Sequence, residues 1–311
     1  MKRESFHQFR FGANMAKGPT VCAAVAGNPI SHSLTPFLFK KVAQHLQSRD
    51  HTITFHTCEK IQHTSLIDAL AWGHAKMTAL AKEDEGADPT KREIWLSITS
   101  PLKHQLPIDS GIEWPIGEPM LASVNQMRHD GHVWNAANTD GAGLLMVARE
   151  FGFDFNLTDD LDCPLLCMTG GGSTARACAA AWTEAGGEIW WKEGRRNLSP
   201  RGPWKDSIVN PRDVCDHVGR RLHIDFDQPA GSAPEIKGER IDAGIDAPVF
   251  LSVSYSDGEF ESVIENEWGL FLDGRWLLAA QHLQGWAHLY YPPAADDLPT
   301  LSELMDILIS Y

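Results

Sequence analysis

One stretch decides the fold of this 311-residue chain: Pro164-Leu165-Leu166-Cys167-Met168-Thr169-Gly170-Gly171-Gly172-Ser173. Its first half is apolar without alternation, as in a strand buried on both faces of a parallel sheet. Three glycines then end the strand, an alanine-rich helix follows, and Glu188-Ile189-Trp190-Trp191 has the composition of the next strand. This order of elements predicts a βαβ unit.

The glycine turn of this unit predicts a dinucleotide site. Glycines between a strand and a helix let a pyrophosphate approach the backbone, and the helix dipole favours its charge. The next strand leads into Lys192-Glu193-Gly194-Arg195-Arg196, where the adenosine ribose is expected. An acidic residue at this place favours NAD, whereas arginine accommodates the 2′-phosphate of NADP. The consecutive arginines Arg195 and Arg196 favour NADP, with NAD as the alternative.

Strands and helices also alternate elsewhere in the chain. Strands are expected at Thr20–Ala26, Thr52–Cys58, Ile94–Thr99, Val249–Val253 and Leu270–Leu272, helices after Thr35-Pro36 and at Leu66–Trp72, Leu277–Tyr290 and Leu301–Ile309, and a hairpin around His129-Asp130-Gly131. For residues 196–247 the sequence predicts only loops and short helices. The alternation predicts an α/β fold with a largely parallel sheet, in a chain long enough for two domains.

Composition narrows the class of protein. A net charge of −14 argues against a nucleic-acid surface, which needs a basic face. No apolar run approaches the ~18–20 residues that span a bilayer, so no membrane partner is expected. The residues after Met1 lead into no apolar signal core, so a cytoplasmic location is expected. Six cysteines and 14 histidines show no metal-ligand spacing, so no metal is expected.

Four polar residues follow strand ends or precede helices, and each has an ordinary explanation when taken singly. Lys103 is most simply a surface lysine, Asp140 the N-cap of a helix, and Ser33 and Thr35 caps of the helix at Pro36. A lysine in a cleft can also serve as an acid or base, and a carboxylate can orient it. Only their joint occurrence is informative.

The joint pattern closely resembles the shikimate dehydrogenases, also called the shikimate/quinate dehydrogenase family. Its opening signature is matched by Ala26-Gly27-Asn28-Pro29-Ile30-Ser31-His32-Ser33-Leu34-Thr35-Pro36. Four further segments match in the same order, together with the glycine turn: Ile98-Thr99-Ser100-Pro101-Leu102-Lys103, Ala122-Ser123-Val124-Asn125, Asn138-Thr139-Asp140-Gly141 and Leu277-Leu278-Ala279-Ala280-Gln281. The resemblance runs from about residue 20 to residue 311.

This resemblance implies a role for each matching residue. Lys103 and Asp140 match the catalytic pair, and Gly170, Gly171, Gly172 and Ser173 match the cofactor turn, with Arg195 and Arg196 near the ribose. Ser33 and Thr35 would bind the substrate carboxylate, Thr99, Asn125 and Gln281 its ring hydroxyls, and Tyr255 would help hold it. Lys103 would pass a proton to the alkoxide that forms as hydride arrives, while Asp140 orients the ammonium.

The resemblance also implies an activity and an architecture. The activity is the reversible NADPH-dependent reduction of 3-dehydroshikimate to shikimate, in chorismate and aromatic amino acid biosynthesis. Residues 1–139, completed by 277–311, would form the substrate-binding domain, and residues 140–276 a Rossmann NAD(P)-binding domain. A monomer or a homodimer is expected. The alternatives are a quinate/shikimate dehydrogenase that uses NAD and a catalytically silent nucleotide-binding paralogue.

Several positions depart from the family pattern. Ser173 replaces the last glycine of the turn, and Ser97 stands where asparagine is common. Thr35 replaces a second serine, a choice shared with relatives that accept quinate. Trp276 stands where a small glycine is usual, and its indole is expected close to the nicotinamide pocket.

Overall fold

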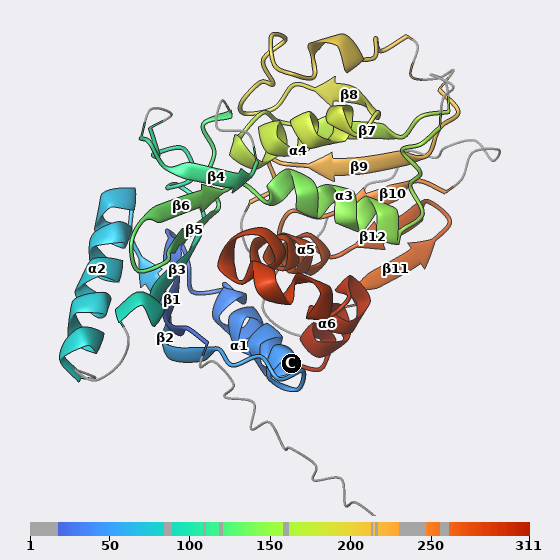
Figure 1. The fold of residues 1–311 in the computed structure, drawn as a ribbon. Coiled ribbons are helices and arrows are strands. Elements are labelled where there is room, and N and C mark those ends of the chain that lie inside the picture. Colours follow the sequence, from blue (N-terminus) through green and yellow to red (C-terminus); the bar gives the residue numbers. More distant parts are fainter. Residues whose placement is uncertain are drawn as a thin grey trace, which may run out of the picture.

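Two sheets organise the protein in the computed structural model, which describes residues 18–83, 89–107, 110–117, 121–157, 162–212, 214, 217–229, 247–255 and 261–311. Figure 1 shows them with helices packed between and around them. None of the helices in these ranges is long and apolar enough to cross a membrane. Residues 1–17 and 84–88 lie outside the described residues, as do 213, 215–216 and 230–246 in the segment 196–247, for which loops and short helices are expected.

The first sheet has six strands. Their order is β2 (Thr54–Gln62), β1 (Thr20–Gly27), β3 (Arg92–Ile98), β5 (Gln126–His129), β6 (Trp134–Ala137) and β4 (Glu113–Ile116). Only β5 runs antiparallel to its neighbours, β3 and β6. The β5–β6 pair is the hairpin predicted around Gly131. The other pairs, β1–β2, β1–β3 and β4–β6, are parallel, so the expectation of a mostly parallel sheet is confirmed.

A helix covers each face of this sheet (Figure 1). Val21 and Ala23 of β1 pack with the apolar face of α1 (Thr35–Gln47). Ala24, one residue on, belongs to a separate core with α2 (Leu66–Glu83). Successive side chains of a strand point to opposite faces, so a wholly apolar β1 requires cover on both sides. The helix α2 extends well beyond the expected end at Trp72, and its buried positions continue to Leu80.

The second sheet also has six strands. Their order is β11 (Val263–Asn266), β12 (Gly269–Leu272), β10 (Val249–Leu251), β9 (Arg221–Asp225), β7 (Leu165–Thr169) and β8 (Glu188–Lys192). All described pairs are parallel except β11–β12. Since β8 lies on one side of β7 and β9 on the other, the chain changes direction at β7. In sheets of this type, ligands bind beyond the carboxyl ends of the strands at that switch point.

Helices between the sheets approach one another closely because glycines face the contacts. The helix α3 (Asp140–Glu150) packs on α4 (Ser173–Glu184), where a Cβ on Gly141 would lie 2.4 Å from the carbonyl oxygen of Ala177. It also packs on α5 (Arg275–Gly285), where a Cβ on Gly143 would lie 2.9 Å from Cγ of Gln281. The junction after β6 is therefore held against both sheets.

The last part of the chain returns to the first sheet. After α5 come a π-helical turn (Trp286–Tyr290), a 3₁₀ segment (Pro292–Asp297) and α6 (Leu301–Ile309), which a Thr300–Glu303 capping box opens. The buried Tyr290 stacks on Trp95 of β3 with ring centroids 5.0 Å apart. Its hydroxyl donates to the carbonyl oxygen of Leu96 at 2.8 Å and also contacts Oε1 of Gln126.

Tyr290→Phe is expected to lower the free energy of unfolding by roughly 1–3 kcal/mol, because it leaves two buried acceptors without this donor. Chemical denaturation measures the change. Tyr291→Phe is the matched control, since Tyr291 is only half-buried and its hydroxyl makes no hydrogen bond within the described ranges. Equal losses for the two variants would contradict the role given to the Tyr290 hydroxyl.

Candidate functional site

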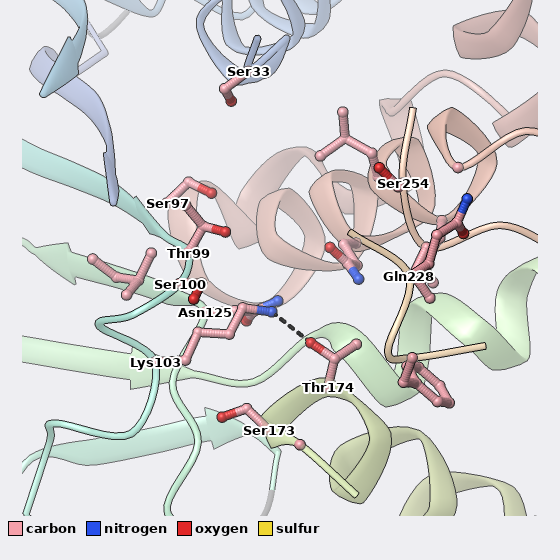
Figure 2. A pocket seen from close by; sticks show the side chains of 18 of the residues that line it. Ser33, Ser97, Thr99, Ser100, Lys103, Asn125, Ser173, Thr174, Gln228 and Ser254 are labelled. Atoms are coloured by element: carbon pink, nitrogen blue, oxygen red, sulfur yellow. Dashed lines mark hydrogen bonds between the residues drawn. The ribbon is translucent and has the colours of Figure 1, made fainter. Parts of the chain in front are cut away.

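A cleft of about 640 Å³ lies where the carboxyl ends of strands from both sheets meet. From the first sheet it is lined by segments that follow β1 and β3, and from the second by segments that follow β7, β9 and β10. Figure 2 shows hydroxyl, amide and amine groups converging on it. The residues expected at the site that line this cleft are Ser33, Thr35, Thr99, Lys103, Asn125, Gly172, Ser173, Arg195, Arg196, Tyr255 and Gln281.

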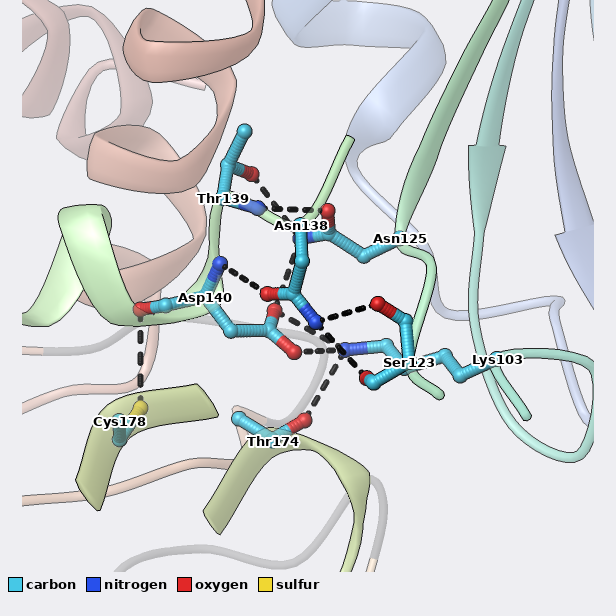
Figure 3. Close-up of polar contacts among 8 residues, drawn as sticks. All are labelled: Lys103, Ser123, Asn125, Asn138, Thr139, Asp140, Thr174 and Cys178. Carbon is cyan, nitrogen blue, oxygen red and sulfur yellow. Dashed lines mark hydrogen bonds and ion pairs between the residues drawn. The ribbon is translucent and has the colours of Figure 1, made fainter. Parts of the chain in front are cut away.

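Lys103 and Asp140 form an ion pair at the cleft wall (Figure 3). The Lys103 ammonium donates to both carboxylate oxygens of Asp140, at 3.0 and 2.7 Å. The Asp140 side chain is fully buried, whereas the Lys103 side chain is 15% exposed and lines the cleft. A buried carboxylate requires such a partner, because an unpaired buried charge is costly. Lys103 therefore presents its charge to the cleft with Asp140 behind it.

Thr174 holds the third hydrogen of the ammonium. Its hydroxyl lies 3.0 Å from Nζ of Lys103 and comes from the first turn of α4, immediately after the glycine turn (Figure 2). The sequence alone did not single out Thr174, because only the tertiary structure brings the first turn of α4 to Lys103. The residue that directly follows the expected cofactor turn thus touches the expected acid–base group.

Asn125 supports the buried carboxylate. Its amide nitrogen donates to Oδ1 of Asp140 at 2.8 Å and to the hydroxyl of Thr139 at 2.9 Å, and its oxygen accepts from the Thr139 backbone at 2.8 Å. Both amide hydrogens are therefore used within the protein, and only the carbonyl oxygen has capacity left for a ligand. Asn138 holds the same junction by donating to Ser123 (Figure 3).

The simple interpretation of Asp140 as a helix cap is wrong. Thr139 is the N-cap residue of α3, and its side chain makes no capping hydrogen bond. Asp140 is the first helical residue and directs its carboxylate to Lys103. Its backbone N–H is satisfied by Oδ1 of Asn138 at 3.0 Å. The start of α3 thus directs the Asp140 carboxylate to Lys103, and the carboxylate does not cap the helix.

Hydroxyl groups gather at the other end of the cleft. Ser33 and Thr35 are buried at the start of α1, and both line the cavity. Tyr255 reaches them from the segment after β10, where its hydroxyl accepts from the backbone N–H of Leu34 at 3.3 Å. Residues on both sheets therefore meet at this end as well.

His282 fixes the hydroxyl of Thr35 and was not anticipated from the sequence. Its Nε2 lies 3.0 Å from Oγ1 of Thr35, and its Nδ1 has no partner among the described residues. Burial lowers the pKa of His282 to about 3, so the ring is neutral. When the proton of the neutral ring is on Nε2, Nδ1 is a buried acceptor without a partner. This costs less free energy than a buried N–H at Nδ1 without an acceptor. The hydroxyl hydrogen of Thr35 is then free to point to a ligand.

The glycine turn offers its backbone to the cleft at Gly172. A Cβ at Gly172 would meet nothing within 4 Å, and no side chain caps the first turn of α4. Gly170 has φ +87 and sits against Asp227, and a Cβ at Gly171 would lie 2.3 Å from the carbonyl carbon of Asn197. Gly170 and Gly171 thus shape the turn without lining the cavity, while Gly172 and Ser173 line it. Free N–H groups at a helix N-terminus suit a phosphate.

Two arginines border this end of the cleft. The backbone N–H of Arg195 donates to Asp227, and its guanidinium donates to the Asp227 carbonyl at 2.8 Å. Arg196 makes no hydrogen bond or ion pair within the described part of the chain. Burial and the charge of Arg196 lower the pKa of Arg176, which is anchored to the carbonyls of Gly171 and Leu121. Positive charge therefore accumulates beside the turn, where an anionic group would bind.

The expected crowding by Trp276 does not occur. Trp276 is buried outside the set of residues that line the cleft, although Leu277 and Leu278 belong to it. Its ring packs edge-on against Phe151 at 4.8 Å, and its Nε1 donates to the Ser262 carbonyl at 2.7 Å. The indole points into the core because the first turn of α5 rotates it away from the cavity.

No protein-family model matches the chain, and no curated protein sequence matches it. Several solved structures match the chain. The shikimate 5-dehydrogenase from Thermus thermophilus in complex with shikimate has a TM-score of 0.56 and 17% identity over 94% of this chain and 100% of that chain. The shikimate 5-dehydrogenase from Listeria monocytogenes in complex with shikimate and NAD has a TM-score of 0.60 and 14% identity over 93% and 96%.

A third structure, a shikimate dehydrogenase in complex with NADP+, has a TM-score of 0.58 and 16% identity over 94% and 95% of the two chains. The likeness spans nearly the whole of each protein. At these identities it establishes a shared fold. The predicted fold class, an open mostly parallel sheet joined to a Rossmann-type sheet, is therefore confirmed.

Acid is expected to destabilise the protein through buried histidines. Burial lowers the pKa of His282 from 6.5 to about 3 and that of His223 to about 4. The unfolded chain takes up these protons below pH 6.5, while the folded chain does not, so stability is full above pH 6.5 and falls as the pH drops towards 4. Between pH 7 and 5.5 the two groups should lower the free energy of unfolding by about 2 kcal/mol.

Urea denaturation at the two pH values measures this loss. His282→Gln removes one of the two groups, so the loss in this variant should be smaller than that of the wild type by about 1 kcal/mol. An equal loss in both proteins would mean that folding does not lower the pKa of His282.

Proposed function

We propose that this protein is a shikimate dehydrogenase, which catalyses the reversible NADPH-dependent reduction of 3-dehydroshikimate to shikimate. One observation carries the proposal: the Lys103 ammonium, backed by the buried Asp140, lies between a hydroxyl-lined end of the cleft and an uncapped helix N-terminus. A cyclic hydroxy acid fits the first end and a dinucleotide the second. The structures of shikimate dehydrogenases with the same fold support this substrate class.

The substrate would lie between the two sheets. Ser33 and Thr35 would donate hydroxyl hydrogens to its carboxylate, with Thr35 oriented by His282. Thr99, Asn125 and Gln281 would meet its ring hydroxyls, with Asn125 acting as an acceptor because its amide hydrogens are already used. Tyr255 would close this end from the other sheet.

Lys103 would supply the proton of the reaction. Hydride transfer to the carbonyl carbon is chemistry that the nicotinamide provides when bound. The carbonyl oxygen then gains negative charge, and a positioned ammonium can protonate it. Asp140 fixes the direction of the ammonium and stabilises its charge, so Lys103 does not have to be reoriented during the reaction. The substrate oxygen would compete with Thr174 for the third ammonium hydrogen.

NADP is the proposed cofactor, with NAD as the alternative. The backbone N–H groups at Gly172 and Ser173 would bind the pyrophosphate, since Gly172 leaves space for close approach. Arg195 and Arg196 line the cleft and would bind the 2′-phosphate, whereas Glu193 is exposed and does not line it. This arrangement favours NADP over NAD, because the acidic residue that would hold a ribose 2′-hydroxyl does not line the cleft.

The proposal includes the organisation of the chain. Residues 1–139 with 277–311 would act as the substrate-binding domain and residues 140–276 as the NAD(P)-binding domain, in a cytoplasmic monomer or homodimer. A quinate/shikimate dehydrogenase that uses NAD is the second candidate, since Thr35 places a methyl group beside the carboxylate site. A silent paralogue is disfavoured, because the Lys103–Asp140 pair is formed and Trp276 leaves the cleft open.

A two-by-two assay of shikimate and quinate against NADP and NAD tests the proposal. Reduced nicotinamide should form fastest with shikimate and NADP. Arg196→Ala should raise the KM for NADP by at least ~10-fold, the scale of one lost charge-assisted hydrogen bond, with little change for NAD. Absence of turnover in all four combinations would remove the enzymatic proposal, and a faster reaction of quinate with NAD would select the second candidate.

Lys103→Ala should lower kcat by at least ~100-fold, the usual scale for a positioned acid–base group. Stopped-flow or steady-state rates measure the loss. Lys40→Ala, on the exposed face of α1, is the matched control and should keep the wild-type rate. Thr174→Val should lower the rate less than Lys103→Ala does and shift its pH profile, because it removes one acceptor from the ammonium. An unchanged rate in Lys103→Ala would remove Lys103 from the mechanism.

A further inference from the structure

We propose that Cys163, Glu188 and His217 form a binding site for a zinc ion at the end of the second sheet opposite the cleft. Their ligand atoms, one from each side chain, all lie within 4.8 Å of one another. Sγ of Cys163 is 3.8 Å from Nε2 of His217, and Nε2 is 3.4 Å from Oε2 of Glu188. These three side chains match no spacing motif, because they are 25 and 29 residues apart in the chain (163, 188, 217).

The distances suit tetrahedral zinc. Zinc binds thiolate sulfur at about 2.3 Å and imidazole nitrogen or carboxylate oxygen at about 2.0–2.2 Å, so neighbouring ligand atoms lie roughly 3.3–3.6 Å apart. The His217–Glu188 separation is already within this range, and the Cys163–His217 separation needs to close by a few tenths of an ångström. The Cys163–Glu188 separation lies within 4.8 Å and needs to close by up to roughly 1 Å. Mixed sulfur, nitrogen and oxygen ligands are those that zinc accepts, whereas calcium and magnesium require oxygen.

Strand pairing builds this cluster. Leu165 of β7 is in register with Glu188 of β8 on one side and Arg221 of β9 on the other. Cys163 immediately precedes β7, and the segment with His217 precedes β9. All three ligands therefore stand at the amino ends of adjacent parallel strands.

The backbone around the cluster is tightly held. The guanidinium of Arg221 donates to the carbonyl oxygens of Val214 at 2.9 Å and His217 at 2.8 Å. A Cβ at Gly219 would lie 2.0 Å from the carbonyl oxygen of Cys163, so only glycine permits this approach of the two segments. Glu188 is fixed by its N–H, which donates to the Pro164 carbonyl at 2.9 Å. Little ordering would remain for a metal to impose.

Burial also fits a closed metal site with one open side. His217 and Cys163 are 1% and 6% exposed, whereas the Glu188 side chain is 32% exposed. Glu188 thus marks the side from which an ion and a water molecule as fourth ligand would enter.

The thiolate and the carboxylate together neutralise the charge of Zn²⁺, which offsets the repulsion from the nearby Arg221. A metal here would cross-link β7, β8 and the segment before β9, and so would stabilise the sheet without taking part in hydride transfer.

Metal titration of the full-length chain tests the site. After treatment with a chelator, the protein should bind one equivalent of Zn²⁺ and gain several degrees in Tm, as binding to the folded state alone requires. Co²⁺ in place of Zn²⁺ should give a thiolate-to-cobalt charge-transfer band. Cys163→Ser should abolish this band and weaken Zn²⁺ binding by more than the roughly 100-fold that an outer-shell change can cost. Cys58→Ser, in the first sheet and half-buried, is the matched control and should keep both.

Glu188→Gln provides a second variant for the case in which Cys163→Ser does not fold. The side chain of Glu188 is partly exposed, so this variant should have the Tm of the chelator-treated wild type and lose the increase with Zn²⁺. Saturable binding that is unchanged in either folded variant, or no saturable binding of Zn²⁺ or Co²⁺ by the wild type, would overturn the proposal. Turnover at the cleft should be the same with and without Zn²⁺, which separates this test from that of the proposed enzymatic activity.

Discussion

The buried carboxylate of Asp140 is the group on which the site depends. It has no exposed surface, and its oxygens accept hydrogen bonds from the side chains of both Lys103 and Asn125. Removing one partner of a buried ion pair typically costs about 3–5 kcal/mol, because the other charge is left unsolvated. The end of β3, the start of β5 and the start of α3 must therefore keep their relative positions. One electrostatic requirement thus links the fold to the chemistry.

Glycines make this arrangement possible by letting helices approach. Gly141 and Gly143 face α4 and α5 on either side of the first turn of α3, where any side chain would collide. Their positions directly after Asp140 mean that the same short stretch carries the carboxylate and anchors it between the two sheets. The close contact with α4 also brings the Thr174 hydroxyl to Lys103. Packing and the proposed proton chemistry therefore share the same residues.

The second sheet has different chemistry at its two ends. At the carboxyl ends of β7 and β9, uncapped helix N–H groups and arginines favour an anionic dinucleotide. At the amino ends, a thiol, an imidazole and a carboxylate come together. Parallel strands place the like ends of distant segments side by side, and for this reason each end can collect side chains that are far apart in the sequence.

The order of elements and the glycine turn could be predicted from the sequence, because each lies in a local pattern of apolar runs and turns. The candidate residues Lys103, Asp140, Ser33 and Thr35 were singled out only by the resemblance of their motifs to the shikimate dehydrogenases. The strands β4, β9 and β11 were missed because charged residues interrupt their apolar runs, so that pairing within the sheet rather than a local pattern defines them. Tertiary structure alone decided that Trp276 turns into the core, that His282 meets Thr35, and that Cys163, Glu188 and His217 converge. Such contacts depend on strand register and helix rotation, which are set by burial across the whole chain and leave no local signal.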